Sequence, residues 1–171
     1  MPLQHVVVIN DASRARGGAT GLAVLSALRL RARGLRVSYV CGDAGDAPEL
    51  AAAGVEVIAA GSGRLLERGR GHAMRRGIFD PDMRDFTAEA VARTDGPGTV
   101  YHLHGWAQIF SPSVFTALAP VAQKTFIHAH DMFLACPNGV YMDYRRNEVC
   151  RRVPASAACI LTHCDKRSYA H

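Results

Sequence analysis

The chain has 171 residues, of which 49% are hydrophobic and 20% are charged, and its formal net charge is +5. This length fits about one domain with a buried core, and the composition excludes an intrinsically disordered chain. The N-terminus has neither the charged start nor the apolar run of a signal peptide, and no apolar run reaches the ~20 residues that span a bilayer. We therefore expect a cytoplasmic protein whose five cysteines are thiols or metal ligands rather than disulfides.

Arginine supplies nearly all of the positive charge, since Lys124 and Lys166 are the only lysines. The one cluster, Arg64–Arg76, contains no Phe, Trp or Tyr, whereas nucleic-acid surfaces interleave basic and aromatic side chains. We therefore expect no nucleic-acid partner. Peripheral contact of this cluster with an anionic membrane stays open, and a solvated basic loop is the simpler interpretation.

The first third of the chain alternates apolar runs of strand length with helical patterns. Three runs have the β-branched, apolar character of covered parallel strands: His5–Asn10, Leu35–Cys41 and Val55–Ala59. A helical pattern that begins after Gly17-Gly18 ends near Gly34, and a short helix is predicted over 47–53. This order predicts an α/β fold with a doubly wound parallel sheet.

The middle of the chain continues the alternation. Frequent glycines over 61–77 predict loop and broken helix, and Asp80-Pro81 begins a clearer helix that runs to about Arg93. A fourth strand is predicted at Thr99–Leu103, and Ser111-Pro112 predicts the cap and first turn of another helix. A short, apolar, buried strand is expected to start at Lys124. After it, residues 140–144 predict a short strand or hairpin arm, and 145–154 are polar and basic.

Histidines gather where the fourth and fifth strands end, in the segments HLHG and HAHD. Alternation along a strand places His102 and His104 on one face, and His128 and His130 on one face of the neighbouring strand. Because ligands bind beyond the carboxyl ends of the strands in open α/β sheets, we expect the terminal His104 and His130 to reach this crevice. His130 and Asp131 would position a substrate hydroxyl, and His104 would line the same cleft. A zinc site of the four histidines and a purely structural role are the alternatives.

The Gly17-Gly18 pair precedes a helix, where free N–H groups and the helix dipole favour an anion. Two glycines would let a phosphate or a sugar approach the backbone closely, although such a pair is also a common tight turn. The surrounding sequence fits neither G-x-G-x-x-G nor a P-loop, and Cys41 rather than an acidic residue ends the second strand.

Four cysteines fall late in the chain, in a loop-rich segment: Cys136, Cys150, Cys159 and Cys164. Four thiolates could hold a structural zinc ion. The spacing lacks C-x2-C, so four partly buried thiols are the alternative. Cys41 is expected in the core.

The ordered set of motifs resembles the N-terminal domain of family-4 glycosyltransferases of the GT-B fold. The resemblance covers nearly the whole chain, residues 1–171, and rests on VVVIND with the following RGGATG loop, the GLRVSYVC and GVEVIAAG strands, HLHGW, and above all FIHAHDMFLACPNG. The late cysteine arrangement is similar to that of bacterial members acting on surface polysaccharides. The expected fold is thus one Rossmann-like half of a GT-B architecture.

The resemblance implies transfer of a sugar from a nucleotide-diphosphate donor to a glycan or lipid-linked acceptor, with retention and with no metal required for the chemistry. It places His130 at the sugar-transfer centre with Asp131 beside it, Gly17-Gly18 near the donor phosphates, and His104, Gly105 and Trp106 at the substrate. In this family a second domain grips the nucleotide sugar with a pair of glutamates, whereas Glu148 is the last glutamate here. We therefore expect a truncated chain or one half of a split enzyme, inactive alone.

Two other interpretations stay open. The chain could be a non-catalytic module that binds a sugar or acceptor, or the partner subunit of a split glycosyltransferase. It could also be a small zinc-stabilised α/β protein in which the cysteines matter and the histidines do not.

Overall fold

The computed structural model describes residues 2–15 and 17–164, and contacts divide the chain into two compact units, Met1–His128 and Ala129–His171. The first unit contains a five-stranded sheet in the order β3-β2-β1-β4-β5, in which every neighbouring pair is parallel. The strands are β1 His5–Asn10, β2 Arg36–Cys41, β3 Glu56–Ala59, β4 Thr99–Leu103 and β5 Thr125–Ile127. The chain leaves β1 first toward β2 and β3, and later returns to its other side with β4. The predicted α/β class and parallel, doubly wound sheet are confirmed.

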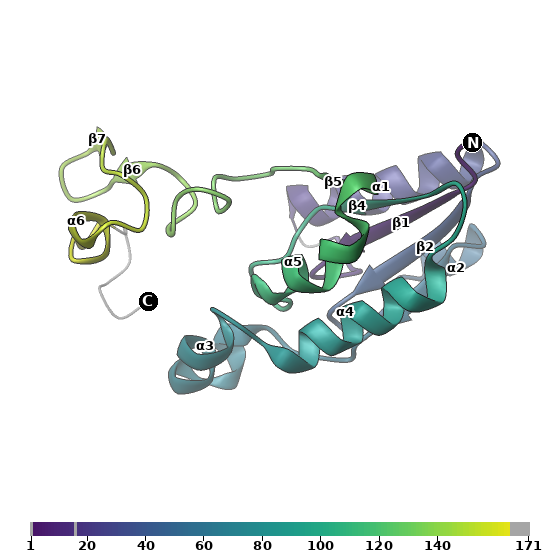
Figure 1. Cartoon of the computed structure of the whole chain (residues 1–171), viewed down its shortest axis with the longest axis horizontal. Helices are drawn as coiled ribbons and strands as arrows, with labels where there is room; N and C mark the ends of the chain where they lie inside the picture. The colour runs from purple at the N-terminus through teal and green to yellow at the C-terminus, as the bar shows by residue number, and fades with distance from the viewer. Residues whose placement is uncertain (1, 16, 165–171) are drawn as a thin grey trace. The chain divides into compact units, whose positions relative to one another are not determined.

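Helices cover both faces of this sheet (Figure 1). Val6 and Val8 of β1 pack in a cluster with α1 and α2, whereas Val7 and Ile9 pack in a second cluster with α4 and α5. This alternation is the two-residue period of a strand that is buried on both sides. The helices of this unit are α1 Gly18–Ala32, α2 Pro48–Ala52, α3 Arg70–Arg76, α4 Pro81–Thr94 and α5 Ser113–Leu118.

The glycine-rich segment is loop and broken helix, as predicted. Two short pieces, the 3-10 helix η1 Leu65–Arg68 and then α3, meet at Gly69, whose φ of 95° breaks the helix. The next helix, α4, starts as predicted at Asp80, whose carboxylate accepts the N–H groups of Asp82 (3.0 Å) and Met83 (3.4 Å). This arrangement satisfies N–H groups that the first turn leaves free.

The start of α5 differs from the prediction. Pro112 rather than Ser111 occupies the N-cap position. Ser111 is buried with a φ of 63°, and its hydroxyl accepts the N–H groups of Asp80 (3.1 Å) and Ser113 (3.3 Å). The serine therefore ties the start of α4 to the start of α5, which sequence spacing alone cannot reveal.

The prediction of a buried fifth strand was wrong. After the 3-10 helix η2 Ala119–Lys124, β5 has only three residues, and Phe126 and Ile127 are 63% and 44% exposed. β5 pairs with β4 on one side and stands last in the sheet, so among the described residues no further strand lies against its outer edge. An apolar run predicts a strand but does not show its place in the sheet.

The second unit has little regular structure. β6 Met142–Asp143 and β7 Glu148–Val149 form an antiparallel pair, which confirms the predicted hairpin arm, and α6 Ala157–Ile160 is a single turn. Among its described residues the buried ones are Cys136, Gly139 and Asp143, while most of its large apolar side chains are exposed. A segment this small without an apolar core ordinarily needs a covalent, metal or partner contact to hold its fold.

Within residues 2–15 and 17–164, no helix combines the length and the apolar character that crossing a lipid bilayer requires.

Candidate functional site

Asp11, directly after β1, fixes the carboxyl edge of the sheet. Its carboxylate accepts the N–H groups of Gln108 (2.9 Å), Ile109 (2.7 Å) and Phe110 (3.0 Å), in the segment that follows β4. Its carbonyl oxygen accepts the N–H groups of Gly42 and Asp43, after β2. Burial raises the pKa of Asp11, and the three N–H donors act against that rise. One residue, through its side chain and its main-chain carbonyl, thus links the ends of β1, β2 and β4.

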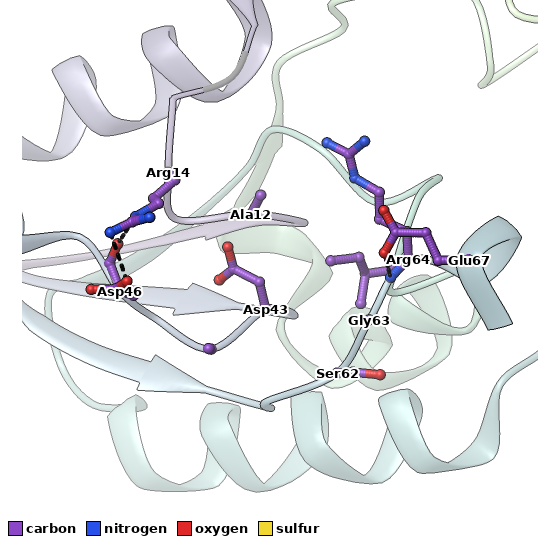
Figure 2. Close-up of a pocket in the computed structure, with 10 residues that line it drawn as sticks. Ala12, Arg14, Asp43, Asp46, Ser62, Gly63, Arg64 and Glu67 are labelled. Atoms are coloured by element: carbon purple, nitrogen blue, oxygen red, sulfur yellow. Dashed lines mark hydrogen bonds and ion pairs between the residues drawn. The ribbon is translucent and has the colours of Figure 1, made fainter.

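A polar cavity of about 290 Å³ opens beside these strand ends. Figure 2 shows Arg14 and Asp46 joined on one side, Arg64 and Glu67 on the other, and Asp43 between them. The Arg14 guanidinium lies 2.8 Å from the Asp46 carboxylate. Arginine and carboxylate side chains around one cavity can donate to and accept from a ligand that is rich in hydroxyl groups.

Asp43 is held as a carboxylate in this cavity. It accepts the backbone N–H (2.8 Å) and the hydroxyl (3.1 Å) of Ser13, and the N–H of Gly45 (3.1 Å). Burial works against ionisation, but these hydrogen bonds outweigh it and hold the pKa of Asp43 below its ordinary value. Asp43 could not be selected from the end of the second strand, because Cys41 rather than an acidic residue stands there. An acid two residues beyond a strand end was the available signal.

Gly105 lies where the end of β4 meets the end of β1. A methyl group added there would stand 2.6 Å from the Asn10 side-chain oxygen. Asn10 is 1% exposed and donates to the Ala12 carbonyl (2.6 Å) and to the Thr20 hydroxyl (3.2 Å), so it cannot yield without losing these bonds. The predicted site glycine is therefore required by packing, whatever it binds.

Gly17 and Gly18 form the start of α1, as predicted. Gly17 occupies the N-cap position without a side-chain cap, and the first turn carries no acidic residue. A methyl group added at either glycine would meet no described atom beyond the neighbouring residues within 4 Å. The 15-residue helix thus presents its N-terminus to open space, where an anion is favoured.

Three histidines converge at the ends of β4 and β5. One ring nitrogen from each of His102, His104 and His128 lies within 4.8 Å of the others. This corrects the expectation that only His104 and His130 reach a common place. The register pairs His102 with Phe126 and Leu103 with Ile127, so the next step brings His104 beside His128, on the face that His102 also occupies.

Contacts are described for two other predicted residues, Trp106 and Asp131. Trp106 packs edge-on against Phe115, with ring centroids 5.0 Å apart. His130 and Asp131 belong to the second unit, where the Asp131 carboxylate accepts the N–H of Phe133 (3.0 Å). Their catalytic roles, and the meeting of His130 with His104, stay predictions.

Two of the four cysteines of the second unit are linked through Asn138. Its side-chain oxygen lies 3.0 Å from the Cys136 sulfur, and its amide nitrogen lies 3.2 Å from the Cys164 sulfur. Burial opposes ionisation of Cys136, but N–H groups of residues 138–141 outweigh it and lower the pKa of this thiol. Cys150 lies 3.7 Å from the Arg152 guanidinium. All four cysteines are free thiols in the structure, and zinc binding by them stays a prediction.

Comparisons of the chain with models of protein families, with curated proteins and with solved structures found no significant match.

Proposed function

We propose that this chain is the acceptor-side half of a retaining glycosyltransferase of the GT-B type. The observation that carries the proposal is the polar cavity at the carboxyl edge of a doubly wound parallel sheet, in the same unit as the open N-terminus of α1. Ligands of such sheets bind at this edge, close to the point where the strand order reverses. Here that point lies between β1 and β4, where Asp11 and Gly105 are found.

The chemistry of the cavity suits a sugar better than a diphosphate. Asp43, Asp46 and Glu67 outnumber the two arginines that line it, so a polyanion would meet repulsion there. Sugar hydroxyls both donate and accept, and the lining offers charged partners of both kinds. In the proposal, the acceptor occupies the cavity and the donor phosphates approach Gly17 and Gly18.

His130 and Asp131 are proposed to act at the sugar that is transferred. An imidazole and a carboxylate side by side can orient a hydroxyl and stabilise charge that develops at the donor sugar. A second domain, on the same polypeptide or on a partner, would hold the nucleotide. The proposed place of action is the cytoplasmic side of a membrane, where lipid-linked acceptors are found.

A peripheral membrane contact is part of the same proposal. Leu66, Ile78 and Phe79 are exposed to 64%, 76% and 42% in and around the arginine-rich segment. Apolar side chains next to arginines suit an anionic bilayer surface. A structural zinc ion on the four cysteines is likewise proposed, because the second unit has no apolar core among its described residues.

The experiment is a transfer assay on the native polypeptide with a panel of nucleoside-diphosphate sugars, measured as nucleoside diphosphate release. An acceptor-cavity variant, Asp43→Asn, should raise the acceptor KM more than it lowers kcat, since it removes a contact made in both ground and transition states. Glu89→Ala, at an exposed position of α4 outside the cavity lining, is the control and should behave as the wild type. Binding of a glycan without any nucleotide release would favour the non-catalytic module.

A further inference from the structure

We propose that His102, His104 and His128 bind one divalent transition-metal ion of the zinc class, with a coordination position open to solvent. The proposal does not depend on the proposed sugar transfer. It concerns the three-histidine cluster alone, in which one ring nitrogen from each residue lies within 4.8 Å of the others.

The distances are close to those of a bound ion. Imidazole nitrogens lie ~2.0–2.1 Å from zinc in tetrahedral sites, which sets adjacent ligand nitrogens about 3.3 Å apart. The Nδ1 of His102 and the Nε2 of His104 are 3.3 Å apart. The remaining nitrogen pairs lie within 4.8 Å, so an approach of at most about 1.5 Å closes the set.

The backbone places two of the ligands before any metal arrives. The backbone N–H of His104 donates to the Ile9 carbonyl (2.8 Å), and the backbone N–H of His128 donates to the Leu103 carbonyl (2.8 Å). These bonds continue the sheet beyond the last paired residues of β4 and β5. His104 is 3% exposed, and its ring lies 4.1 Å from that of His102 and 4.8 Å from that of His128, centroid to centroid. The backbone and the buried His104 ring therefore lose little conformational freedom when the site closes.

The adjustable ligand is the exposed one. His128 is exposed at the outer edge of the sheet, whereas His102 is half-buried and His104 is buried. Rotation of the His128 side chain is thus the movement that would complete the site, and the same opening admits water or a ligand to a fourth position. Three histidines plus one exchangeable position suit zinc, cobalt, nickel or copper, whereas magnesium and calcium prefer oxygen ligands.

The test is a titration of the full chain with Co²⁺ and Zn²⁺ against a chromophoric chelator, followed by absorption. Thiolate ligands give cobalt an intense near-ultraviolet charge-transfer band that imidazole ligands lack, so binding by the cysteines is read separately. We expect His128→Ala to lower the metal affinity of the site without the thiolate band by at least about tenfold. Even changes in residues that only support metal ligands can produce a loss of this size. His72→Ala removes a histidine of α3 and should leave this affinity unchanged.

His102→Gln provides a second variant from the neighbouring strand and should show the same loss. Trp106 fluorescence and circular dichroism of the metal-free variants confirm that they are folded. Equal affinity and stoichiometry in the wild type, His128→Ala and His102→Gln would overturn the proposal, as would a loss in only one of the two variants. A wild-type chain whose bound cobalt always shows the thiolate band would overturn it as well.

Discussion

Replacing Gly105 with alanine should destabilise the first unit strongly, because the methyl group has no room. It would stand 2.6 Å from the Asn10 side-chain oxygen and 3.5 Å from the Asp11 carboxylate. Overpacking a close-packed site costs about 1–3 kcal/mol. Displacing Asn10 would also weaken its bonds to Ala12 and Thr20, each worth about 0.5–1.5 kcal/mol. We expect a total loss of about 2–4 kcal/mol in the free energy of unfolding.

Urea denaturation followed by fluorescence measures this loss in the right unit, because Trp106 is the only tryptophan and packs on Phe115. With a slope of about 2 kcal/mol per molar urea, the midpoint should fall by about 1–2 M. The matched control is Gly21→Ala, in the body of α1, where an added methyl group meets no described atom beyond its neighbours within 4 Å. It should stabilise by about 0.5–1 kcal/mol. Equal midpoints for the two variants would refute the packing argument.

Three further outcomes are expected. Asp11→Ala should cost at least about 3 kcal/mol by thermal denaturation, since it leaves the buried N–H groups of Ile109 and Phe110, and the N–H of Gln108, without their acceptor. Replacing the exposed Asp46 with alanine should cost less than about 1 kcal/mol, and similar losses would contradict the argument. Hydrogen bonds from the Ser38 hydroxyl and then from Arg93 lower the pKa of Glu56. Its contribution to stability is therefore present above the ordinary pKa of 4.5 and is lost as the pH falls through the lower folded value. The wild type should therefore lose more stability than Glu56→Gln as the pH falls below 4.5, by a difference of up to about 1 kcal/mol. The same change in urea midpoint with pH for both proteins would count against this prediction. Chelation should release zinc and speed tryptic cleavage between Arg145 and Arg152; unchanged cleavage would argue against a structural zinc.

The sheet could be predicted from the sequence because residues 6–9 of the run His5–Asn10 are apolar on both faces, as in a parallel strand that is covered on both sides. The place of β5 could not be predicted, since the residues Thr125–Ile127 look alike whether a strand is central or outermost. His102 and His128 come together because of the register between β4 and β5. The alternation of side chains along a single strand does not reveal its register with the neighbouring strand.

Long-range polar contacts were also beyond sequence reasoning. In the sequence, Asp11 is one of several polar residues in a loop. In the structure, its carboxylate accepts backbone N–H groups that lie 97 to 99 residues further along the chain. Backbone donors carry no residue identity, so no pattern of side chains marks the partner. Gly105, in contrast, could be selected from the HLHGW segment, although the reason found here is the close approach of Asn10.

The most direct test of the account is nucleoside diphosphate release by the native polypeptide, purified from its own cells, with His130→Ala beside the wild type. We predict acceptor-dependent release by the wild type and a loss of at least about 100-fold in kcat for His130→Ala, with the same Trp106 unfolding transition in both. Equal turnover of the two proteins would remove His130 from the mechanism. Release by neither protein, with any nucleoside-diphosphate sugar and with any partner that co-purifies still present, would contradict the proposed transfer itself.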